Sequence, residues 1–330
     1  MNAMNSTFEP SDHIYDVAIV GGGVAGLAAA VYAGRDGFDV CLIEGDYISN
    51  TEMPGGALML TSDIQNYPGF YEGAGETLIT VMRNQAVRFV KTVLTEQVLA
   101  ANLSTSETEP HVLTTNQGTV VRSRAVILAT GAVSRMLDIP GEENLFGKGV
   151  STCATCDGFF FQNKNVYVVG GGDTAVEDAL FLTRYTPNVT MVVRADRFRA
   201  SGPEVRHVLQ KNQDMQDPFK VLWNTTVTEI HGDNNVTGLT LQNPETSFHV
   251  AADGLFVAVG RIPSTGFLNQ SGVMLDEENF IMLNPGSQNV PGFPGVYAAG
   301  DAVDKKFRQA VTSAGRAVEA ALEAREWLLR

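Results

Sequence analysis

A glycine pattern between two strand-like segments is the feature that most limits how this chain folds. Residues 15–20 (YDVAIV) predict a buried strand, residues 27–35 predict a helix, and residues 38–43 predict a second strand ending at Glu44. The first turn carries a G-x-G-x-x-G motif made of Gly21, Gly23 and Gly26. Glycines let the backbone approach a pyrophosphate at a helix N-terminus, where the N–H groups favour negative charge. Glu44 is placed to bind a ribose 2′-hydroxyl, so we predict an adenine dinucleotide here.

The same arrangement recurs in the second half of the chain. Residues 165–169 predict a strand, residues 176–184 a helix and residues 189–193 another strand. The turn that follows the first of these strands carries Gly170, Gly172 and Ala175. A chain of 330 residues is long enough for two domains of ordinary size. We therefore predict an α/β protein with two Rossmann-like dinucleotide-binding domains.

The two motifs differ at the end of their second strand. Where the first has Glu44, the second has Val193 followed by Arg194, and Arg197 and Arg199 come next. A carboxylate repels a ribose 2′-phosphate, whereas guanidinium groups attract it. The first site therefore suits a free ribose hydroxyl, as in FAD, and the second suits NADPH better than NADH. The alternative is that these arginines only form a solvated loop.

Three further segments are expected to complete the nucleotide sites. Residues 125–130 (AVILAT) and residues 254–259 (GLFVAV) predict strands that run into Gly131 and Gly260. The tail has a short strand at residues 295–299, a Gly-Asp pair and an alanine-rich helix. The candidate ligand residues at these ends are Thr130, Gly131, Gly300, Asp301, Arg308, Gln309 and Ala310.

A C-x-x-C pair lies between the two glycine motifs. Cys153 and Cys156 lack a second cysteine pair or nearby histidines, so zinc is not expected, and a pair of structural thiols is the remaining alternative. The pattern favours a dithiol/disulfide couple, since C-x-x-C environments lower the thiol pKa. Asp157 is placed to donate a proton to a departing thiolate. Flavin is the natural relay between nicotinamide and such a couple.

The position of the cysteines has a mechanistic consequence. They directly precede the second nucleotide motif, so the disulfide and the nicotinamide belong to one domain and the flavin to the other. Both must meet the same flavin ring. A hinge rotation near Gly131 and Gly260 is the simplest way to alternate them.

Charge and leader sequence narrow the class of protein. The net charge is −14, which argues against nucleic acid or an anionic membrane as the main partner. Residues 1–12 are polar and carry no Lys or Arg, which does not fit a signal or transit peptide. We expect a cytoplasmic enzyme, and the third cysteine, Cys41, is expected to be a small buried hydrophobe.

With these motifs the sequence resembles the low-molecular-weight thioredoxin reductases. The resemblance rests on GGGVAG from Gly21, PGGALMLTSDIQNYPGF from Pro54, GVSTCATCDGFFF from Gly149, GGGDTAVEDA from Gly170 and the terminal GD and RQA. It implies a homodimer that reduces thioredoxin or a similar dithiol protein. It also implies a discontinuous FAD domain (residues 1–130 and 262–330), with the pyridine-nucleotide domain (residues 131–261) inserted.

The same resemblance implies roles for individual residues. Cys156 would be the thiol next to the flavin, Cys153 would attack the protein disulfide, and Asp157 would be the acid/base. The residues expected to contact the flavin cofactor are Gly56, Asn66, Asp301, Gln309 and Ala310.

Two positions depart from the family pattern. The family's NADPH signature is His-Arg-Arg-x-x-x-Arg, but this chain has Val193-Arg194-Ala195 and then Arg199, so one arginine is missing. The family's Gly-Gly-Gln beside the flavin is Gly55-Gly56-Ala57 here. These changes leave open a related flavin disulfide reductase with another donor, such as ferredoxin, or another dithiol substrate. A flavoprotein that senses redox state without turnover is a third reading, but no interaction module supports it.

Overall fold

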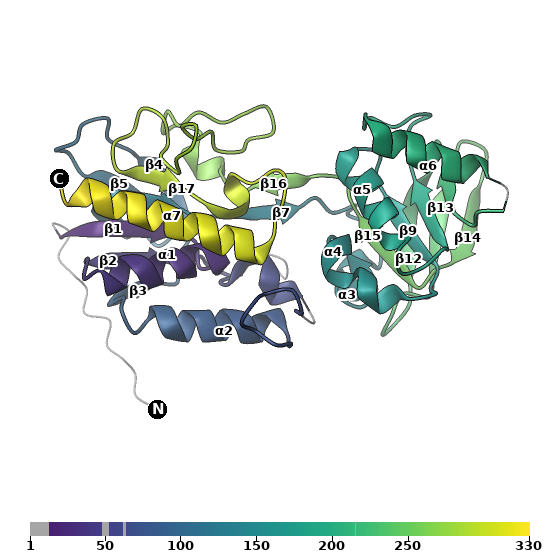
Figure 1. Cartoon of the computed structure of the whole chain (residues 1–330), viewed down its shortest axis with the longest axis horizontal. Helices are drawn as coiled ribbons and strands as arrows, with labels where there is room; N and C mark the ends of the chain where they lie inside the picture. The colour runs from purple at the N-terminus through teal and green to yellow at the C-terminus, as the bar shows by residue number, and fades with distance from the viewer. Residues whose placement is uncertain (1–12, 48–52, 62–63, 215) are drawn as a thin grey trace. The chain divides into compact units, whose positions relative to one another are not determined.

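The computed structural model describes residues 13–47, 53–61, 64–214 and 216–330, and the chain divides into two compact units (Figure 1). The first unit is discontinuous and comprises the described residues within Met1–Thr61, Tyr67–Val133 and Pro263–Arg330. The second comprises the described residues within Ser134–Ile262, and the described part of the short segment Ser62–Asn66, residues 64–66, is grouped with it. The chain therefore leaves the first unit, builds the second, and returns to complete the first.

A seven-stranded sheet forms the centre of the first unit. Its order is β3-β2-β1-β6-β5-β4, with β17 also paired to β6. The strands are β1 (Ile14–Val20), β2 (Val40–Ile43), β3 (Thr92–Leu94), β4 (Val98–Asn102), β5 (His111–Thr115), β6 (Val120–Leu128) and β17 (Val296–Ala298). The pairs β1–β2, β1–β6, β2–β3 and β6–β17 are parallel, whereas β4–β5 and β5–β6 are antiparallel. The carboxyl ends of β1, β2, β6 and β17 consequently meet at one edge of the sheet.

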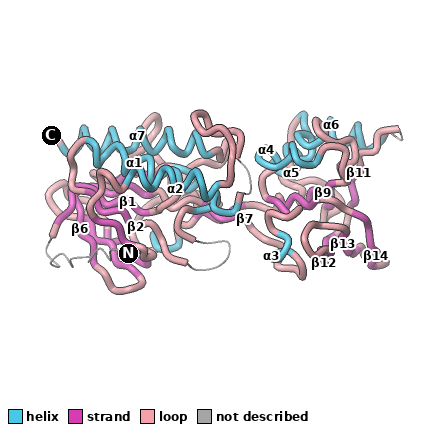
Figure 2. Tube along the Cα trace, turned by 90° about the horizontal axis from the view of Figure 1, so that it is seen from below, coloured by secondary structure: helices cyan, strands magenta, loops and turns pink. Residues whose placement is uncertain are grey.

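Helices cover one face of this sheet. α1 (Val24–Arg35) and α7 (Ala310–Leu328) lie side by side although they are far apart in the chain, and α2 (Gly75–Ala86) packs beside α1 (Figures 1 and 2). Small residues allow the close packing, because α1 buries a run of alanines and α7 buries Ala317, Ala320, Ala321 and Ala324. β2 and the last four residues of β6 (125–128) are apolar and buried at every position, as expected for parallel strands that are covered on both faces.

The second unit has its own parallel sheet, in the order β11-β10-β9-β15-β8. Its strands are β8 (Val150–Ser151), β9 (Val166–Val169), β10 (Val189–Val192), β11 (Lys220–Leu222) and β15 (Gly254–Val257). The helices of the unit are α3 (Glu142–Leu145), α4 (Ala154–Asp157), α5 (Asp173–Leu182) and α6 (Pro203–Gln213). A separate antiparallel sheet is made of β12 (Thr226–His231), β13 (Gly238–Gln242) and β14 (Ser247–Ala251).

The two passages of the chain between the units pair with each other. β7 (Ala132–Ser134) and β16 (Arg261–Pro263) form a two-stranded sheet. At its ends the N–H of Arg135 donates to the carbonyl of Gly260 (2.9 Å) and the N–H of Ser264 donates to the carbonyl of Gly131 (3.0 Å). The expected connections near these two glycines are therefore held together as one ribbon.

The predicted α/β fold class is confirmed, and the observed elements differ from the predicted ones mainly at their ends. α1 begins at Val24 and α5 at Asp173, earlier than the predicted starts at residues 27 and 176. Helical hydrogen bonding thus starts directly after the second glycine of each motif. The second strand of the first motif begins at Val40, not at residue 38. No helix among the described residues is long and apolar enough to cross a membrane.

Candidate nucleotide and redox sites

The first glycine motif forms the turn between β1 and α1. Gly21 has a φ of 121°, and a Cβ atom added to it would overlap the carbonyl oxygen of Ala129. A Cβ atom on Gly26 would overlap the carbonyl oxygen of Gly21. The packing of α1 against the end of the sheet therefore requires glycine at both positions.

Gly23 is different, because the described protein does not require a glycine there. Its backbone is extended (φ −78°, ψ −174°), which any residue adopts. An added Cβ atom would meet the carbonyl oxygen of Gly55 only at 3.5 Å, an ordinary contact. Gly56 is a neighbour of Gly23, because a Cβ atom added to Gly56 would lie 3.7 Å from the Cα of Gly23. Gly56 has a φ of 70°. The bare backbone at Gly23 is what close approach of a pyrophosphate needs.

Glu44 stands at the end of β2, as predicted, but its carboxylate is already engaged. The side chain is 6% exposed. Arg83 donates from Nε and Nη2 to the two carboxylate oxygens at 2.8 and 3.0 Å, and Thr95 donates its hydroxyl at 2.9 Å. A carboxylate has about four acceptor positions, so one remains for a ribose hydroxyl. Arg83 and Thr95 were not predicted from the sequence.

The end of β6 lies beside this turn. The N–H of Ala129 donates to the carbonyl of Val20 at 2.8 Å, which holds the two strand ends together. The next residue, Thr130, has a buried hydroxyl oxygen with no hydrogen-bond partner among the described residues. Gly131 has a φ of 71° and open space around its Cα. An unpaired buried hydroxyl is costly, and a polar ligand atom would satisfy it.

The predicted Gly-Asp pair follows β17 and reaches the same place. Gly300 and Asp301 begin the short helix η4 (Gly300–Ala302), and a Cβ atom on Gly300 would lie 2.9 Å from the Cβ of Ala25 in α1. The Asp301 carboxylate accepts a hydrogen bond from the Ser313 hydroxyl of α7 at 3.1 Å. This pair is therefore fixed between the N-terminal turns of α1 and α7.

The segment before α7 is organised by Asp304, which the sequence analysis did not single out. Its carboxylate is 2% exposed and accepts backbone hydrogen bonds at 2.9, 3.0 and 3.1 Å from Lys306, Phe307 and Arg308. Arg308 is held with a φ of 51°, which is uncommon for a residue other than glycine. Burial alone would raise the pKa of Asp304, but these hydrogen bonds and Arg316 outweigh it and hold the pKa below its ordinary value.

The remaining predicted flavin contacts are Gln309, Ala310 and Asn66. Gln309 caps α7 reciprocally with Thr312, and Ala310 is the first residue of the helix. Asn66 is exposed and lies in the segment grouped with the second unit. Bare backbone at Gly23, the unpaired Thr130 hydroxyl and the free acceptor position on Glu44 fit an adenine dinucleotide such as FAD.

The second glycine motif repeats this geometry between β9 and α5. A Cβ atom on Gly170 (φ 144°) would overlap the carbonyl oxygen of Ala258, so glycine is required there. Ala175 is fully buried at the position that Gly26 has in the first motif. Gly172 has extended backbone, and the nearest heavy atom to an added Cβ is the terminal nitrogen of Arg199, at 3.1 Å. As at Gly23, the backbone is bare for a ligand.

The loop after β10 brings one predicted arginine to this turn. The N–H groups of Arg199 and Ala200 donate to the carbonyl of Gly171 at 2.7 and 3.0 Å. Arg194 and Ala195 are exposed on the same loop. The Arg199 guanidinium therefore lies beside the bare glycine, and Arg194 is open to a ligand. This arrangement fits a nucleotide with an additional phosphate.

Cys153 and Cys156 form a disulfide, with their Cα atoms 5.3 Å apart. Cys153 precedes the single-turn helix α4, and its carbonyl accepts the N–H groups of Cys156 and Asp157 at 3.2 and 3.1 Å. Asp157 is half-buried, and the loss of solvation raises its pKa, while a hydrogen bond from the Ser151 hydroxyl opposes the rise. A disulfide and a carboxyl group of raised proton affinity thus share one turn of chain.

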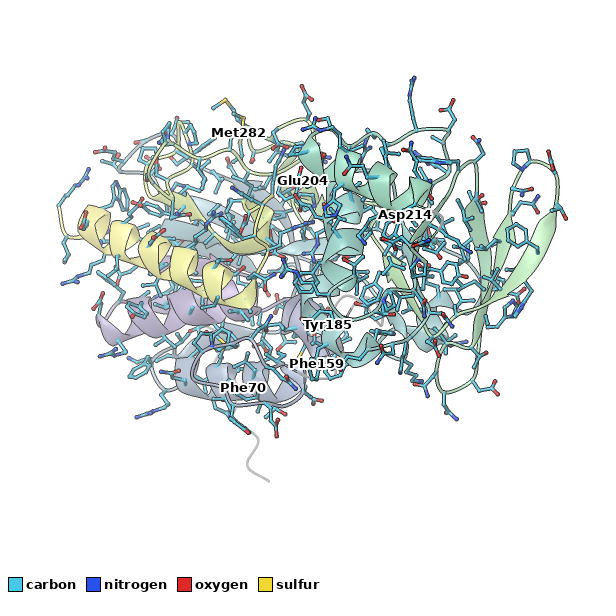
Figure 3. The ribbon with its side chains drawn as sticks, turned by 45° about the vertical axis from the view of Figure 1, so that its right-hand side comes forward. Phe70, Phe159, Tyr185, Glu204, Asp214 and Met282 are labelled. Carbon is cyan, nitrogen blue, oxygen red and sulfur yellow. A yellow bond between two sulfur atoms is a disulfide. The ribbon has the colours of Figure 1, made fainter. Side chains whose placement is uncertain are left out.

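Exposed aromatic side chains follow the disulfide directly. Phe159 and Phe160 are 51% and 39% exposed, although both are large and apolar. Phe159 and Tyr185 lie next to each other, with ring centroids 6.3 Å apart (Figure 3). In the second unit, only Ile262 is a further exposed large hydrophobic residue among those described. An apolar surface beside a reactive group is typical of a protein-docking site.

Two dinucleotide turns and a disulfide beside a half-buried carboxyl group define a class, the disulfide oxidoreductases that use a pyridine nucleotide. The model of one family, described as pyridine nucleotide-disulphide oxidoreductase, matches residues 15–319. A thioredoxin reductase of Mycolicibacterium smegmatis is 42% identical over 96% of this chain and 98% of its own length. A bifunctional thioredoxin reductase/thioredoxin of Mycobacterium leprae is 40% identical over 98% of this chain and 68% of its own length.

A solved structure gives the same result. The thioredoxin reductase from Giardia duodenalis is 34% identical and superposes with a TM-score of 0.87, covering 96% of this chain and 100% of its own. The chain therefore belongs to the pyridine nucleotide-disulphide oxidoreductases, and within them to the thioredoxin reductases. The resemblance drawn from the motifs is confirmed, and with it the oxidoreductase class and the FAD and NADPH cofactors.

Proposed function

We propose that this protein moves two electrons from NADPH, by way of FAD and the Cys153–Cys156 disulfide, to the disulfide of thioredoxin. The observation that carries the proposal is the disulfide itself, formed beside the half-buried Asp157 in the unit that also contains the second glycine motif. A pyridine nucleotide and a disulfide on one unit, with a second dinucleotide site on the other, are the parts that such a transfer needs.

The proposed cofactor assignment follows the two motifs. FAD would be held in the first unit by the β1–α1 turn, Glu44, Thr130 and the Gly300–Asp301 pair, with Gln309 and Ala310 at the start of α7. NADPH would be held in the second unit by Gly170, Gly172, Arg194 and Arg199. When bound, the flavin supplies a two-electron relay between the nicotinamide and the disulfide.

The cysteines have separate proposed roles. Cys156 is the thiol that faces the flavin, and Cys153 is the nucleophile that attacks the substrate disulfide. Cys153 suits that role because it is partly exposed and lies outside the helical turn of α4. Asp157 donates the proton that the leaving thiolate takes up, which its raised pKa favours.

A protein partner is supported by the surface beside the disulfide. Phe159 and Phe160 offer two exposed aromatic rings within a few residues of Cys156, as a docking surface for a small dithiol protein does. The Mycobacterium leprae relative is named for both a thioredoxin reductase and a thioredoxin, which supports thioredoxin as that partner. We propose that the enzyme is cytoplasmic, because in that reducing compartment a cysteine pair of this kind is usually a transient, catalytic disulfide.

The proposal is tested by anaerobic titration of the FAD-loaded protein with NADPH, followed by addition of oxidised thioredoxin. NADPH should bleach the flavin absorbance, and thioredoxin should restore it with release of two thiols per NADPH. Cys153→Ser should keep the bleaching step and lose turnover of thioredoxin.

A flavin that NADPH does not bleach would contradict the NADPH assignment and favour a donor such as ferredoxin. The exposed Ala195, where an arginine would bind phosphate, is the observation behind that second candidate. Wild-type turnover by the Cys153→Ser variant would remove the role given to Cys153.

A further inference from the structure

The hydroxyl of Ser151 lies between the two reacting parts of the redox site. Ser151 ends β8, is 5% exposed, and is paired in register with Phe256 of β15, so its position is fixed by the sheet. Its oxygen accepts the N–H of Cys153 at 3.0 Å, and its proton is donated to the Asp157 carboxylate at 2.5 Å. One side chain therefore contacts both the backbone of the nucleophilic cysteine and the acid.

The hydroxyl has only one proton to give. Its other possible acceptor, the carbonyl of Cys153, lies at 3.5 Å, much farther than Asp157. That carbonyl already accepts the N–H groups of Cys156 and Asp157. The geometry thus favours donation to Asp157 while that group is ionised. When Asp157 is protonated, it can donate to the Ser151 oxygen instead, and the hydroxyl proton turns away.

The surroundings of Asp157 make this hydrogen bond important. α5 packs against α4, and the titratable residues that α5 carries are Asp173, Glu177 and Asp178, with Tyr185 after its end. The short helix η2 (Gly158–Phe161) has no titratable side chain. In the reduced protein, Cys153 and Cys156 add thiolate charge. Burial disfavours the ionised form of Asp157, and the Ser151 hydroxyl is the hydrogen-bond donor that opposes this effect.

We propose that Ser151 is a positioning residue of the disulfide reaction, which orients the Asp157 carboxyl toward the thiols and sets how readily it gives up its proton. The proposal rests on the acid role of Asp157 in the proposed function. In the step concerned, the O–H bond of the Asp157 carboxyl breaks and an S–H bond forms on the leaving thiolate, with no electron transfer. The Ser151 proton then hydrogen-bonds the carboxylate that remains, which stabilises the product of the transfer.

The first measurement is a titration of the oxidised, FAD-loaded protein that needs neither donor nor substrate. Selective carboxyl labelling of aspartate with ¹³C, assigned with Asp157→Asn, reports the protonation of Asp157 by NMR. Ser151→Ala should raise the Asp157 pKa by about one unit, the scale of one hydrogen bond to a charged group. Ser151→Val and Ser151→Thr form a matched pair of equal shape, and only the valine variant should show the rise. Ser247→Ala, on an exposed strand of the same unit, should not.

The second measurement is the pH profile of turnover with thioredoxin. Because a general acid must be protonated to act, activity falls as pH rises through its pKa. Loss of the hydroxyl should therefore move this descending limb to higher pH and lower kcat several-fold, and Ser151→Thr should restore both. In an Asp157→Asn background, Ser151→Ala should no longer change the profile.

The outcomes separate the two proposals. An unchanged Asp157 titration in both Ser151→Ala and Ser151→Val, or an equal shift in Ser151→Thr, overturns the role of Ser151. If the titration moves as expected but the wild-type protein does not turn over thioredoxin, the assignment of Ser151 to Asp157 stands and the proposed substrate fails.

Discussion

Gly23 and Gly26 belong to one motif, but the surrounding protein leaves room for a side chain only at Gly23. Gly26 is required by the protein, because a Cβ atom there would overlap the carbonyl of Gly21. Gly23 meets no such neighbour and has backbone angles open to any residue. Folding therefore explains the glycine at position 26, and we attribute the glycine at position 23 to the proposed pyrophosphate ligand.

This difference gives a matched pair of variants. Gly23→Ala should fold with the wild-type melting temperature when FAD is removed, yet bind FAD at least about tenfold more weakly, or ~1.4 kcal/mol. Gly26→Ala should lose about 1–3 kcal/mol of unfolding free energy, as overpacked sites do. Calorimetry and flavin fluorescence on the FAD-free proteins measure both. Equal FAD affinity in Gly23→Ala and wild type would show that no pyrophosphate lies at this turn.

The missing arginine at position 195 gives a second prediction. Ala195 is exposed on the loop that carries Arg194 and Arg199, so an arginine there can contact the 2′-phosphate of a bound NADPH. Ala195→Arg should tighten NADPH binding by up to about 1.5–3 kcal/mol, and less at high salt. NADH lacks the 2′-phosphate and is the control. The measurement is flavin reduction rate against concentration of each nucleotide, and an equal gain for NADH would rule out a phosphate contact.

At the residue scale, the sequence predicted the motif residues better than their partners. Glu44 follows from the spacing of the first motif, but Arg83 and Thr95 lie 39 and 51 positions away in the chain and follow no pattern that points to Glu44. Ser151 is only six positions from Asp157, yet a strand end and a helical turn separate them. Such contacts depend on how elements meet in space.

At the scale of elements, apolar runs predicted the parallel strands except β3, β8 and β11, which end the sheet orders, and missed the purely antiparallel ones. β1, β9 and β10 stand out because both faces of their sheets are covered. β14 alternates exposed and half-buried residues, and β4 has mixed exposure, so neither has a strong apolar signal. The helices after the two glycine motifs were predicted without their first turns, because the glycine in the first turn of α1 and the acid in that of α5 resemble a loop. The helices α2, α3, α4 and α6 were not predicted.

The Asp304 carboxylate stabilises the turn before α7 through its backbone hydrogen bonds. Asp304→Asn should lower the unfolding free energy at pH 7 by about 1–3 kcal/mol, because a neutral amide binds the three N–H groups and Arg316 less well. The pKa of Asp304 is lowered in the folded state, so this stabilisation is present above the unfolded value of 3.8 and is lost as pH falls through the folded value.

The difference between wild type and Asp304→Asn should therefore narrow as pH falls below about 3.8. Urea unfolding from pH 7 to pH 3 measures it, and Glu109→Gln, at an exposed loop position, is the control. A difference that stays constant over this range would mean that the charge of Asp304 does not hold the turn.

At the scale of the whole molecule, exposed apolar side chains favour a second copy of the chain as a partner of the first unit. All but three of the large hydrophobic residues that are exposed among the described residues belong to this unit, including Met274, Met282 and Leu322. We predict a solution mass twice the 35.4 kDa of one chain. Sedimentation equilibrium from micromolar to nanomolar concentration tests this, and a single-chain mass at micromolar concentration would contradict it.

The discontinuous first unit also sets an order for folding during synthesis. Ser134–Ile262 is one uninterrupted stretch, so the second unit can fold as soon as it leaves the ribosome. The first unit cannot be completed until the second has been synthesised. Its strand β17 pairs with β6 and its helix α7 covers α1, and both β17 and α7 follow the inserted unit in the sequence. Until then the alanine face of α1 lacks its cover, and Gly300 and Asp301 are not yet in place. If the cofactors bind as proposed, the nascent chain completes its nicotinamide site first and its flavin site last. The incomplete first unit is then the folding intermediate most exposed to aggregation and most dependent on chaperones.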